Sequence, residues 1–406
     1  MPAASSAIRG GVVVVVSRLA GGRFVVVDVE PGVDPSEEFE RAWERGARAV
    51  PLARSLPSAA RAALLARLER VRCEPAAGVV LQTSGSSGEP RLIDISIEAM
   101  RASAELGAGV IPFGDGDVWH ASLAPSHVGG VMILMRARFL GGSVRFGAQP
   151  RAWRDLEGAT HVSLVATQLA RLLEDRAAVP SSLKAVMLGG GPSPQALRDA
   201  GISRGVPLFA TYGLTETSSQ VATGALAAGD PATLAGAPLP SASITVDAVS
   251  GEISVDGPML ARGEFVAREH GDELVPLTRP YATRDAGFLD AQGRLHVVGR
   301  IDAMFISGGK NIHPERIERA LCELPFVRAA CVVGVPDAKW GMRPVAFVDL
   351  SSPPPRALAA ILGESLERHL VPDAFLAMPL EESARLKPSR AALAARLASG
   401  ERFDAL

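Results

Sequence analysis

The chain has 406 residues, 47% of them hydrophobic, and this length exceeds what one compact domain usually holds. Its 42 basic and 44 acidic residues nearly cancel, so neither a nucleic acid nor an anionic membrane is favoured as a partner. The scattered Cys73, Cys322 and Cys331 lack metal-ligand spacing and fit reduced thiols. We expect two domains, a small-molecule partner and a cytoplasmic location.

The N-terminal part predicts a β-hairpin followed by helices. The apolar run at residues 12–16 is too short to span a membrane and predicts a buried strand. A second run at 24–27 follows a Gly21-Gly22 turn, which favours a hairpin. Residues 36–73 are rich in Glu, Arg, Ala and Leu and predict helical structure interrupted at 55–57.

The middle and the end of the chain predict layered α/β structure. β-branched runs at 78–81, 162–165 and 185–188 alternate with helical patterns, which favours a largely parallel sheet. Short strands with Gly-containing turns predict a β-rich subdomain from 241 to about 298. Beyond Arg300, a Gly-rich loop at 307–310, a helix from Pro314 and a strand at 330–335 predict a small α/β domain. The SSPPPR stretch at 351–356 is expected to be a surface loop within it.

The segment TSGSSGEPR, which follows the strand-like GVVLQ, has the composition of a phosphate-binding loop. Glycines let the backbone approach an anion, hydroxyls and N–H groups donate hydrogen bonds, and an arginine adds charge. The segment differs from the G-x-x-x-x-G-K-[ST] pattern, and an ordinary surface turn is the alternative. The candidate residues are Thr83, Ser84, Gly85, Ser86, Ser87, Gly88 and Arg91.

A second motif, ATYGLTET at 210–217, combines an aromatic ring, hydroxyls and a carboxylate. Tyr212 could stack on a base, Thr215 could bond a phosphate, and Glu216 could hold Mg²⁺. The alternative is a helix N-terminus capped by Thr215. Upstream, Gly189, Gly190 and Gly191 could admit a purine against bare backbone or form a simple turn.

These two motifs, with YATRD at 281–285, Gly299-Arg300 and Lys387, resemble the adenylate-forming acyl-CoA synthetase superfamily in order and spacing, over residues 75–395. The resemblance implies a large N-terminal domain at 1–301, built of layered α/β subdomains plus a β-rich subdomain. It also implies a small mobile C-terminal α+β domain at 302–406 that turns about a hinge at Asp302. The implied reaction is ATP-driven activation of a carboxylic acid to an acyl-adenylate, followed by acyl transfer to coenzyme A.

The resemblance also implies a role for each motif. The residues at 83–88 and Arg91 would bind the ATP phosphates, and Asp285 would hold the ribose hydroxyls with Arg300 beside it. An exposed salt bridge is the alternative for Arg300. Thr215, Glu216 and Lys387 would be catalytic, and Glu216 would hold Mg²⁺. The adenine would lie against Gly189, Gly190, Gly191, Tyr212 and Gly213, and the pantetheine of coenzyme A against Gly308 and Gly309.

Within the superfamily, the phrases YGLTET, AGAPLP, YATRDAG and WGMRPVA look most like the o-succinylbenzoate-CoA ligases of menaquinone biosynthesis. His127 matches a motif that borders the acid pocket, and Ser218, Ser219 and Gln220 could face a second carboxylate of the acid. Two alternatives stay open: a ligase for another aryl or acyl acid, and an adenylating enzyme that loads a carrier protein. A homodimer is also left open.

Two departures from the superfamily pattern stand out. Arg91 replaces the usual lysine, which keeps the charge but changes its geometry. Only 82 residues precede Thr83, fewer than in long relatives, so we expect a shortened N-terminal lobe.

Overall fold

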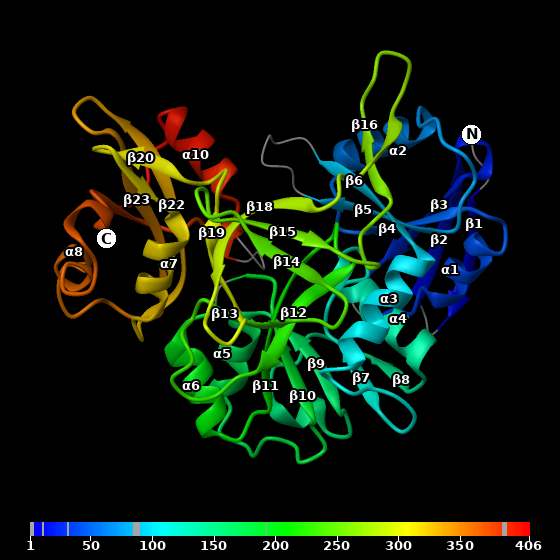
Figure 1. The fold of residues 1–406 in the computed structure, drawn as a ribbon, viewed down its shortest axis with the longest axis horizontal. Coiled ribbons are helices and arrows are strands. Elements are labelled where there is room, and N and C mark those ends of the chain that lie inside the picture. The colour runs from blue at the N-terminus through cyan, green and yellow to red at the C-terminus, as the bar shows by residue number, and fades with distance from the viewer. Residues whose placement is uncertain (1–3, 10–11, 31, 84–89, 192, 384–387) are drawn as a thin grey trace.

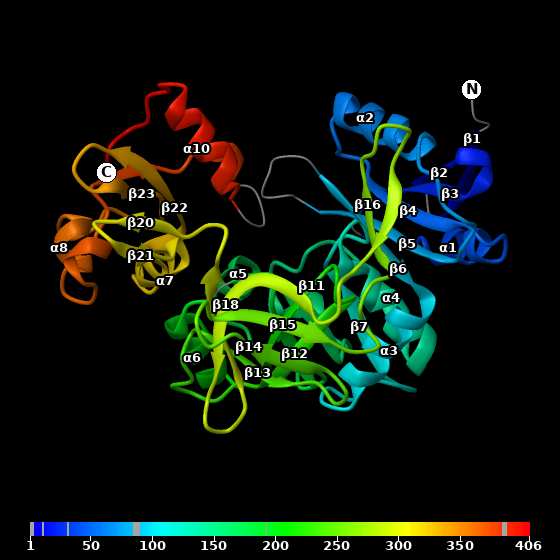
Figure 2. The ribbon, with the colours of Figure 1, turned by 45° about the horizontal axis from the view of Figure 1, so that its top comes forward.

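The computed structural model describes residues 4–9, 12–30, 32–83, 90–191, 193–383 and 388–406. Two large sheets and the helices around them form one body, and a smaller body drawn in yellow, orange and red lies beside it (Figures 1 and 2). No helix in these ranges is long and apolar enough to cross a membrane.

The first sheet has the strand order β1-β2-β3-β4-β5-β6-β16-β17. Its strands are β1 Ala4–Arg9, β2 Val12–Leu19, β3 Phe24–Val29, β4 Arg48–Ala53, β5 Gly78–Thr83, β6 Arg91–Ser96, β16 Gly263–Val266 and β17 Glu273–Pro276. The predicted hairpin is confirmed, because β2 and β3 pair antiparallel with Val16 opposite Val27.

The prediction of helical structure at 36–73 is confirmed in its interruption at 55–57 but is wrong at residues 48–53, which form a strand. Helices α1 (Ser36–Trp43) and α2 (Ser58–Glu69) flank strand β4, which pairs parallel with β3. The first five residues of β4 are all buried. Burial between two strands thus overrides the weak β propensity of its Ala, Leu and Pro residues.

The second sheet has the order β14-β15-β18-β19-β13-β12-β11-β10-β9-β7-β8. Only its β8-β7-β9-β10-β11 part is parallel, because hairpins replace helical crossovers after β11. The parallel strands are β7 Val118–Ala121, β8 Ser143–Phe146, β9 His161–Leu164, β10 Ala185–Leu188 and β11 Leu208–Leu214. The loops after β10 and β11 carry two predicted motifs, as expected for the carboxyl ends of parallel strands.

Antiparallel strands continue this sheet at one edge: β12 Ser219–Ala225, β13 Leu234–Pro238, β14 Ser243–Val246, β15 Glu252–Asp256, β18 Tyr281–Leu289 and β19 Leu295–Arg300. The predicted β-rich region from 241 to about 298 is rich in strands but is divided between the sheets, because β16 and β17 join the first sheet. Helices α3 (Ile97–Ala108) and α4 (Val128–Leu140) pack between the two sheets, with Met100 and Met132 in one core and Ile133 in another. Helices α5 (Ala166–Glu174) and α6 (Gln195–Ser203) cover the outer face.

The small body is built on a third sheet. It contains β20 Phe305–Ser307, β21 Lys310–Ile312, α7 Pro314–Cys322, β22 Val327–Asp337, β23 Gly341–Leu350, α8 Leu358–Leu362, β24 Ala374–Ala377, α9 Leu380–Ser383 and α10 Arg390–Ala398. The predicted surface loop at 351–356 does lie between strand β23 and helix α8. Ile317 and Leu393 lie in cores on opposite faces of the sheet.

Helix α7 and the residue after it face the large body with a polar stripe. Glu315, Arg319 and Glu323 follow one another at four-residue spacing, which places them on one helix face. Arg319 Nη1 donates to the Val298 carbonyl over 2.8 Å, and the Glu323 carboxylate accepts from the first two backbone amides of α6. A Cβ atom on Gly299 would lie 2.5 Å from Glu315 Oε2, so this close approach requires glycine.

Candidate functional site

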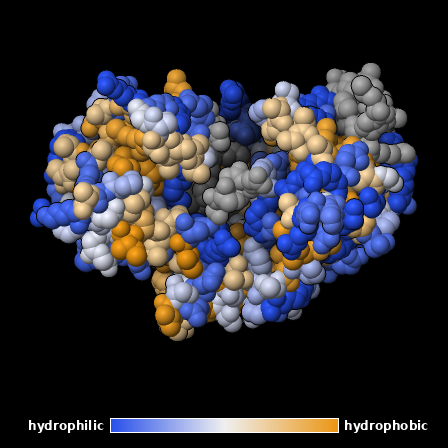
Figure 3. Space-filling view, turned by 90° about the horizontal axis from the view of Figure 1, so that it is seen from above, coloured by the Kyte–Doolittle hydropathy of each residue, from blue (hydrophilic) through white to orange (hydrophobic). Residues whose placement is uncertain are grey.

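A cavity of about 2290 Å³ lies between the large and the small body. Seen from above, it is the hollow between the two parts of the molecule (Figure 3). The predicted site residues that line it are Thr83, Arg91, His127, Gly189, Gly190, Gly191, Gly213, Thr215, Glu216 and Arg300. The fold therefore brings motifs that are more than 200 positions apart in the chain into one space.

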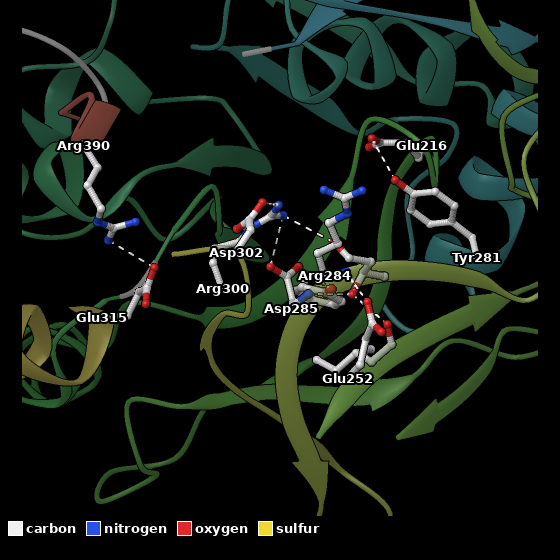
Figure 4. A network of polar contacts seen from close by, with 12 residues as sticks. Glu216, Glu252, Tyr281, Arg284, Asp285, Arg300, Asp302, Glu315 and Arg390 are labelled. Carbon is white, nitrogen blue, oxygen red and sulfur yellow. Dashed lines mark hydrogen bonds and ion pairs between the residues drawn. The ribbon is translucent and has the colours of Figure 1, made fainter. Parts of the chain in front are cut away.

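The Asp285 carboxylate is held between a phenol and a guanidinium (Figure 4). Tyr212 donates its hydroxyl to Asp285 Oδ2 over 2.6 Å, and Arg300 Nη1 lies 3.3 Å from Oδ1. Asp285 and Arg300 are register partners on β18 and β19, which fixes this contact in the sheet. Burial and the Asp285 charge raise the pKa of Tyr212, so the phenol stays a donor. The result is a pre-oriented carboxylate that can accept further hydroxyl hydrogen bonds.

Arg300 also forms a two-point ion pair with Asp302, at 2.9 Å for Nε and 2.7 Å for Nη2. Its side chain is one-third exposed rather than fully solvated. Because Asp302 is the predicted hinge residue, this ion pair connects the Asp285 carboxylate to the link between the two bodies. The hinge itself stays a prediction.

The Glu216 carboxylate is held in a second network. Arg91 Nη1 donates to Glu216 Oε1 over 2.6 Å, and the Tyr281 hydroxyl donates to the same oxygen over 3.0 Å. Arg91 also donates through Nε to Glu264 Oε2 over 2.8 Å, a partner that no sequence motif indicated. Burial, together with the Glu216 charge, raises the pKa of Tyr281 to about 12.

The local backbone explains how Glu216 reaches the cavity. A turn at 215–218 joins β11 to β12, so the helix start that was the alternative for Thr215 does not occur. Glu216 is 5% exposed, and no cluster of three metal-binding side chains was found among the described residues. One carboxylate beside a threonine hydroxyl still suits Mg²⁺, which usually takes its other ligands from water and substrate phosphates.

The turn after β10 is compatible with the predicted contact to a flat ring. Gly190 has φ +78°, and a Cβ atom on Gly189 would lie 2.5 Å from Thr211 Oγ1. All three glycines, 189 to 191, line the cavity with bare backbone. A larger residue at 189 would therefore clash with the Thr211 hydroxyl beside Tyr212.

Some predicted residues lie elsewhere. Ser84, Gly85, Ser86, Ser87, Gly88 and Lys387 are outside the described residues, although Pro388 and Ser389 line the cavity. Gly308 and Gly309 form an exposed turn of the small body and are not part of the cavity wall. Their contact with coenzyme A stays a prediction.

The residues predicted to face the acid are divided. His127 is exposed at the start of α4, lines the cavity and makes no capping hydrogen bond. Ser218 is fully buried, and its hydroxyl donates to the Met259 carbonyl over 2.7 Å, a role within the protein. Ser219 begins β12, and its carbonyl accepts from the Thr217 hydroxyl. Substrate contacts of these three residues stay predictions.

Arg136 on α4 is a buried cation that sequence reasoning missed. It is 3% exposed, donates to Gln220 Oε1 over 2.6 Å and lies 5.0 Å from the Trp119 ring centre. No ion pair with a carboxylate is found for it among the described residues, and burial lowers the pKa of Arg136 to about 10. Gln220 Nε2 is also buried without a partner. Two neighbouring buried donors are suited to an acceptor such as a carboxylate.

Comparison with known proteins explains this arrangement. Residues 20–268 match the AMP-binding enzyme family, and residues 316–385 match the AMP-binding enzyme C-terminal domain. The chain belongs to the AMP-binding enzyme family. The predicted superfamily is thus confirmed, and the two matched regions lie on either side of the proposed boundary at 301.

Several relatives of this AMP-binding enzyme are 2-succinylbenzoate–CoA ligases. It is 39% identical to the 2-succinylbenzoate–CoA ligase of Salmonella typhimurium over 77% of this chain and 67% of that enzyme. The first curated relatives are matched over 59 to 67% of their own length.

Two solved structures resemble the fold. An Arg-to-Lys variant of E. coli MenE with bound OSB-AMS has a TM-score of 0.78 and 30% identity, covering 94% of this chain and 90% of that one. The o-succinylbenzoate coenzyme A synthetase (MenE) of Bacillus subtilis, in complex with ATP and magnesium ion, has a TM-score of 0.66 and 26% identity. It covers 86% of this chain and 79% of that one.

Proposed function

We propose that this enzyme is an ATP-dependent 2-succinylbenzoate–CoA ligase, the same activity as the o-succinylbenzoate-CoA ligases named above. The observation that carries the proposal is that two carboxylates are held at separate points by arginines that line one cavity: Glu216, which itself lines the cavity, by Arg91, and Asp285 by its register partner Arg300. One carboxylate suits ribose hydroxyls and the other a phosphate-bound Mg²⁺. The similarity to 2-succinylbenzoate–CoA ligases supports the choice of acid.

In the first half-reaction, a carboxylate oxygen of the acid attacks the α-phosphorus of ATP. The new P–O bond gives the acyl-adenylate, and the bond to the β-phosphate breaks to release pyrophosphate. Thr83 and Arg91 would bind the phosphates, and Glu216 would hold Mg²⁺, which supplies neutralising charge. Lys387 would stabilise the charge that develops at the α-phosphate. No protein nucleophile is needed, because positioning and charge neutralisation are sufficient for this chemistry.

In the second half-reaction, the thiol sulfur of coenzyme A attacks the acyl carbonyl and AMP leaves. Gly308 and Gly309 would have to approach the adenylate, although they lie outside the cavity in this orientation of the small body. We therefore include in the proposal a rotation of residues 302–406 about Asp302.

We include in the proposal an acid with a second carboxylate that reaches the buried Arg136–Gln220 donor pair, which lies behind the residues that line the cavity. The activated carboxylate must reach the ATP site, whereas the other would meet the guanidinium and the free amide of Gln220. A buried guanidinium gives bidentate hydrogen bonds to a carboxylate and gains most from such a partner. Gln220 was one of the residues that the sequence pointed to for this contact.

The test is incubation of the pure protein with ATP, Mg²⁺, coenzyme A and 2-succinylbenzoate, with mass analysis of the thioester. A panel of other aryl and acyl acids and a phosphopantetheinylated carrier protein serve as parallel substrates. We expect the 2-succinylbenzoyl thioester of coenzyme A as the main product. Turnover with another acid, or acyl transfer only to the carrier protein, would replace this proposal with the corresponding alternative.

A further inference from the structure

Arg284 on β18 has a backbone conformation that its side chain disfavours. Its φ is +62°, and among the described residues only four other non-glycine residues have positive φ. In an L-residue this region brings Cβ close to a carbonyl oxygen, so such a residue persists only where the surrounding structure requires it. Glycine would fit this position without strain.

The strained backbone is fixed on both sides. The Arg284 amide donates to Glu252 Oε1 over 3.1 Å, and its carbonyl accepts from the Ile301 amide over 2.8 Å. The side chain is exposed and lines the cavity. In Figure 4 it projects from β18 on the side of Glu216 and Tyr281, away from Glu252.

Arg284 also differs from the neighbouring arginines in how its charge is paired. Arg91 and Arg300 line the same cavity, but each is already paired with two carboxylates. For the Arg284 guanidinium, the described contacts include no hydrogen bond or ion pair. The strained but fixed backbone at Arg284 therefore places a cation without a described ion-pair partner between the Glu216 and Asp285 networks.

We propose that Arg284 binds the phosphate chain of the nucleotide, between the ribose at Asp285 and the Mg²⁺ at Glu216. This inference rests on the proposed function. A guanidinium can donate two parallel hydrogen bonds to phosphate oxygens, and an exposed, unpaired one needs no prior ion pair to be broken. Arg284 would bind ATP and hold pyrophosphate as the bond to the α-phosphate breaks, while the adenylate product needs it less.

The test compares Arg284→Gly and Arg284→Lys with the wild type in ATP–pyrophosphate exchange driven by 2-succinylbenzoate. We expect the KM values for ATP and pyrophosphate to rise at least 10-fold in Arg284→Gly, with partial rescue in Arg284→Lys. Thioester formation from preformed acyl-adenylate and coenzyme A should stay within about 2-fold of wild type. The melting temperature of Arg284→Gly should not fall, because glycine accepts φ +62°.

Ser241→Gly is the matched control. Ser241 also has a positive φ, +60°, and is exposed outside the cavity wall, so this variant relieves strain without removing a charge. We expect unchanged exchange kinetics. Unchanged KM values in Arg284→Gly, or an increase confined to the KM for coenzyme A, would overturn the proposal.

If none of the tested acids supports ATP–pyrophosphate exchange by the wild type, the proposed function fails while the role of Arg284 is still open to test. Calorimetric titration of ATP with Mg²⁺ then decides the role of Arg284 separately. At least 10-fold weaker binding by Arg284→Gly supports the phosphate contact, and equal binding refutes it.

Discussion

Replacing Arg136 by methionine should have opposite effects on two quantities: the protein should become more stable, and its affinity for the acid should fall. Burial lowers the pKa of Arg136 from the ordinary guanidinium value to about 10, so folding carries this buried charge at a cost of about 3 kcal/mol. The Gln220 hydrogen bond and the Trp119 contact each stabilise the folded protein by about 1 kcal/mol. We therefore expect Arg136→Met to raise the free energy of unfolding without substrate by about 1 kcal/mol.

The same substitution should impair binding of the diacid. A buried carboxylate left without its guanidinium loses about 3 to 5 kcal/mol, which is an increase of about 150- to 4000-fold in KM. The assay is pyrophosphate release with 2-succinylbenzoate and with the two analogues that each lack one carboxylate. The analogue lacking the carboxylate that meets Arg136 should be turned over almost equally by wild type and variant.

The pH dependence gives this prediction a second readout. Because the folded pKa of Arg136 is lowered, its destabilising effect is complete below about pH 10 and fades as the pH rises through that value. The stability advantage of Arg136→Met should therefore be constant up to about pH 10 and shrink as the pH rises above that value in denaturant titrations. An equal loss of activity with the diacid and with the analogue that lacks the carboxylate meeting Arg136, together with a less stable variant, would refute the reasoning.

Three further predictions concern other parts of the chain. Asp285→Asn should weaken the hydrogen bonds to the ribose by about 2 to 3 kcal/mol and raise the KM for ATP about 30- to 150-fold in steady-state assays, whereas an unchanged KM would remove Asp285 from the nucleotide site. Lys387→Ala should lower adenylate formation by orders of magnitude yet leave thioester formation from preformed adenylate intact, and equal loss in both would contradict its role. Burial lowers the pKa of His161, so the unfolded chain binds the proton first and the free energy of unfolding should fall as the pH drops below about 6.5. Denaturant titrations of His161→Gln should lack that part of the slope, and an identical slope would show that His161 does not supply it.

The sequence predicted which residues come together better than the contacts that they make. Motif order was enough to select Glu216, Asp285 and Arg300, which the structure places in two polar networks beside one cavity; their roles in the reaction stay predictions. Glu264 was missed, since it reaches Arg91 only through the pairing of β16 with β6, which joins parts of the chain more than 160 positions apart.

Burial was the property that sequence patterns could not supply. Arg136 and Arg138 stand two positions apart in α4, yet the first side chain is 3% exposed and the second 34%. Both flank Ala137 on one helix, and only the position of the two sheets around α4 decides which of them is desolvated. The same limit explains β4, which lies within a stretch rich in helix-forming residues but pairs with strands on both sides.

The polar stripe of α7 affects the thermodynamics of separating the two bodies. When Glu315, Arg319 and Glu323 leave the large body, they expose charged groups and backbone amides that water solvates at once. Little of the stripe is apolar, so its undocking should carry a small heat-capacity change. The balance between docked and undocked small domains would then respond to ionic strength more than to temperature, because salt screens charge but does not replace buried hydrocarbon.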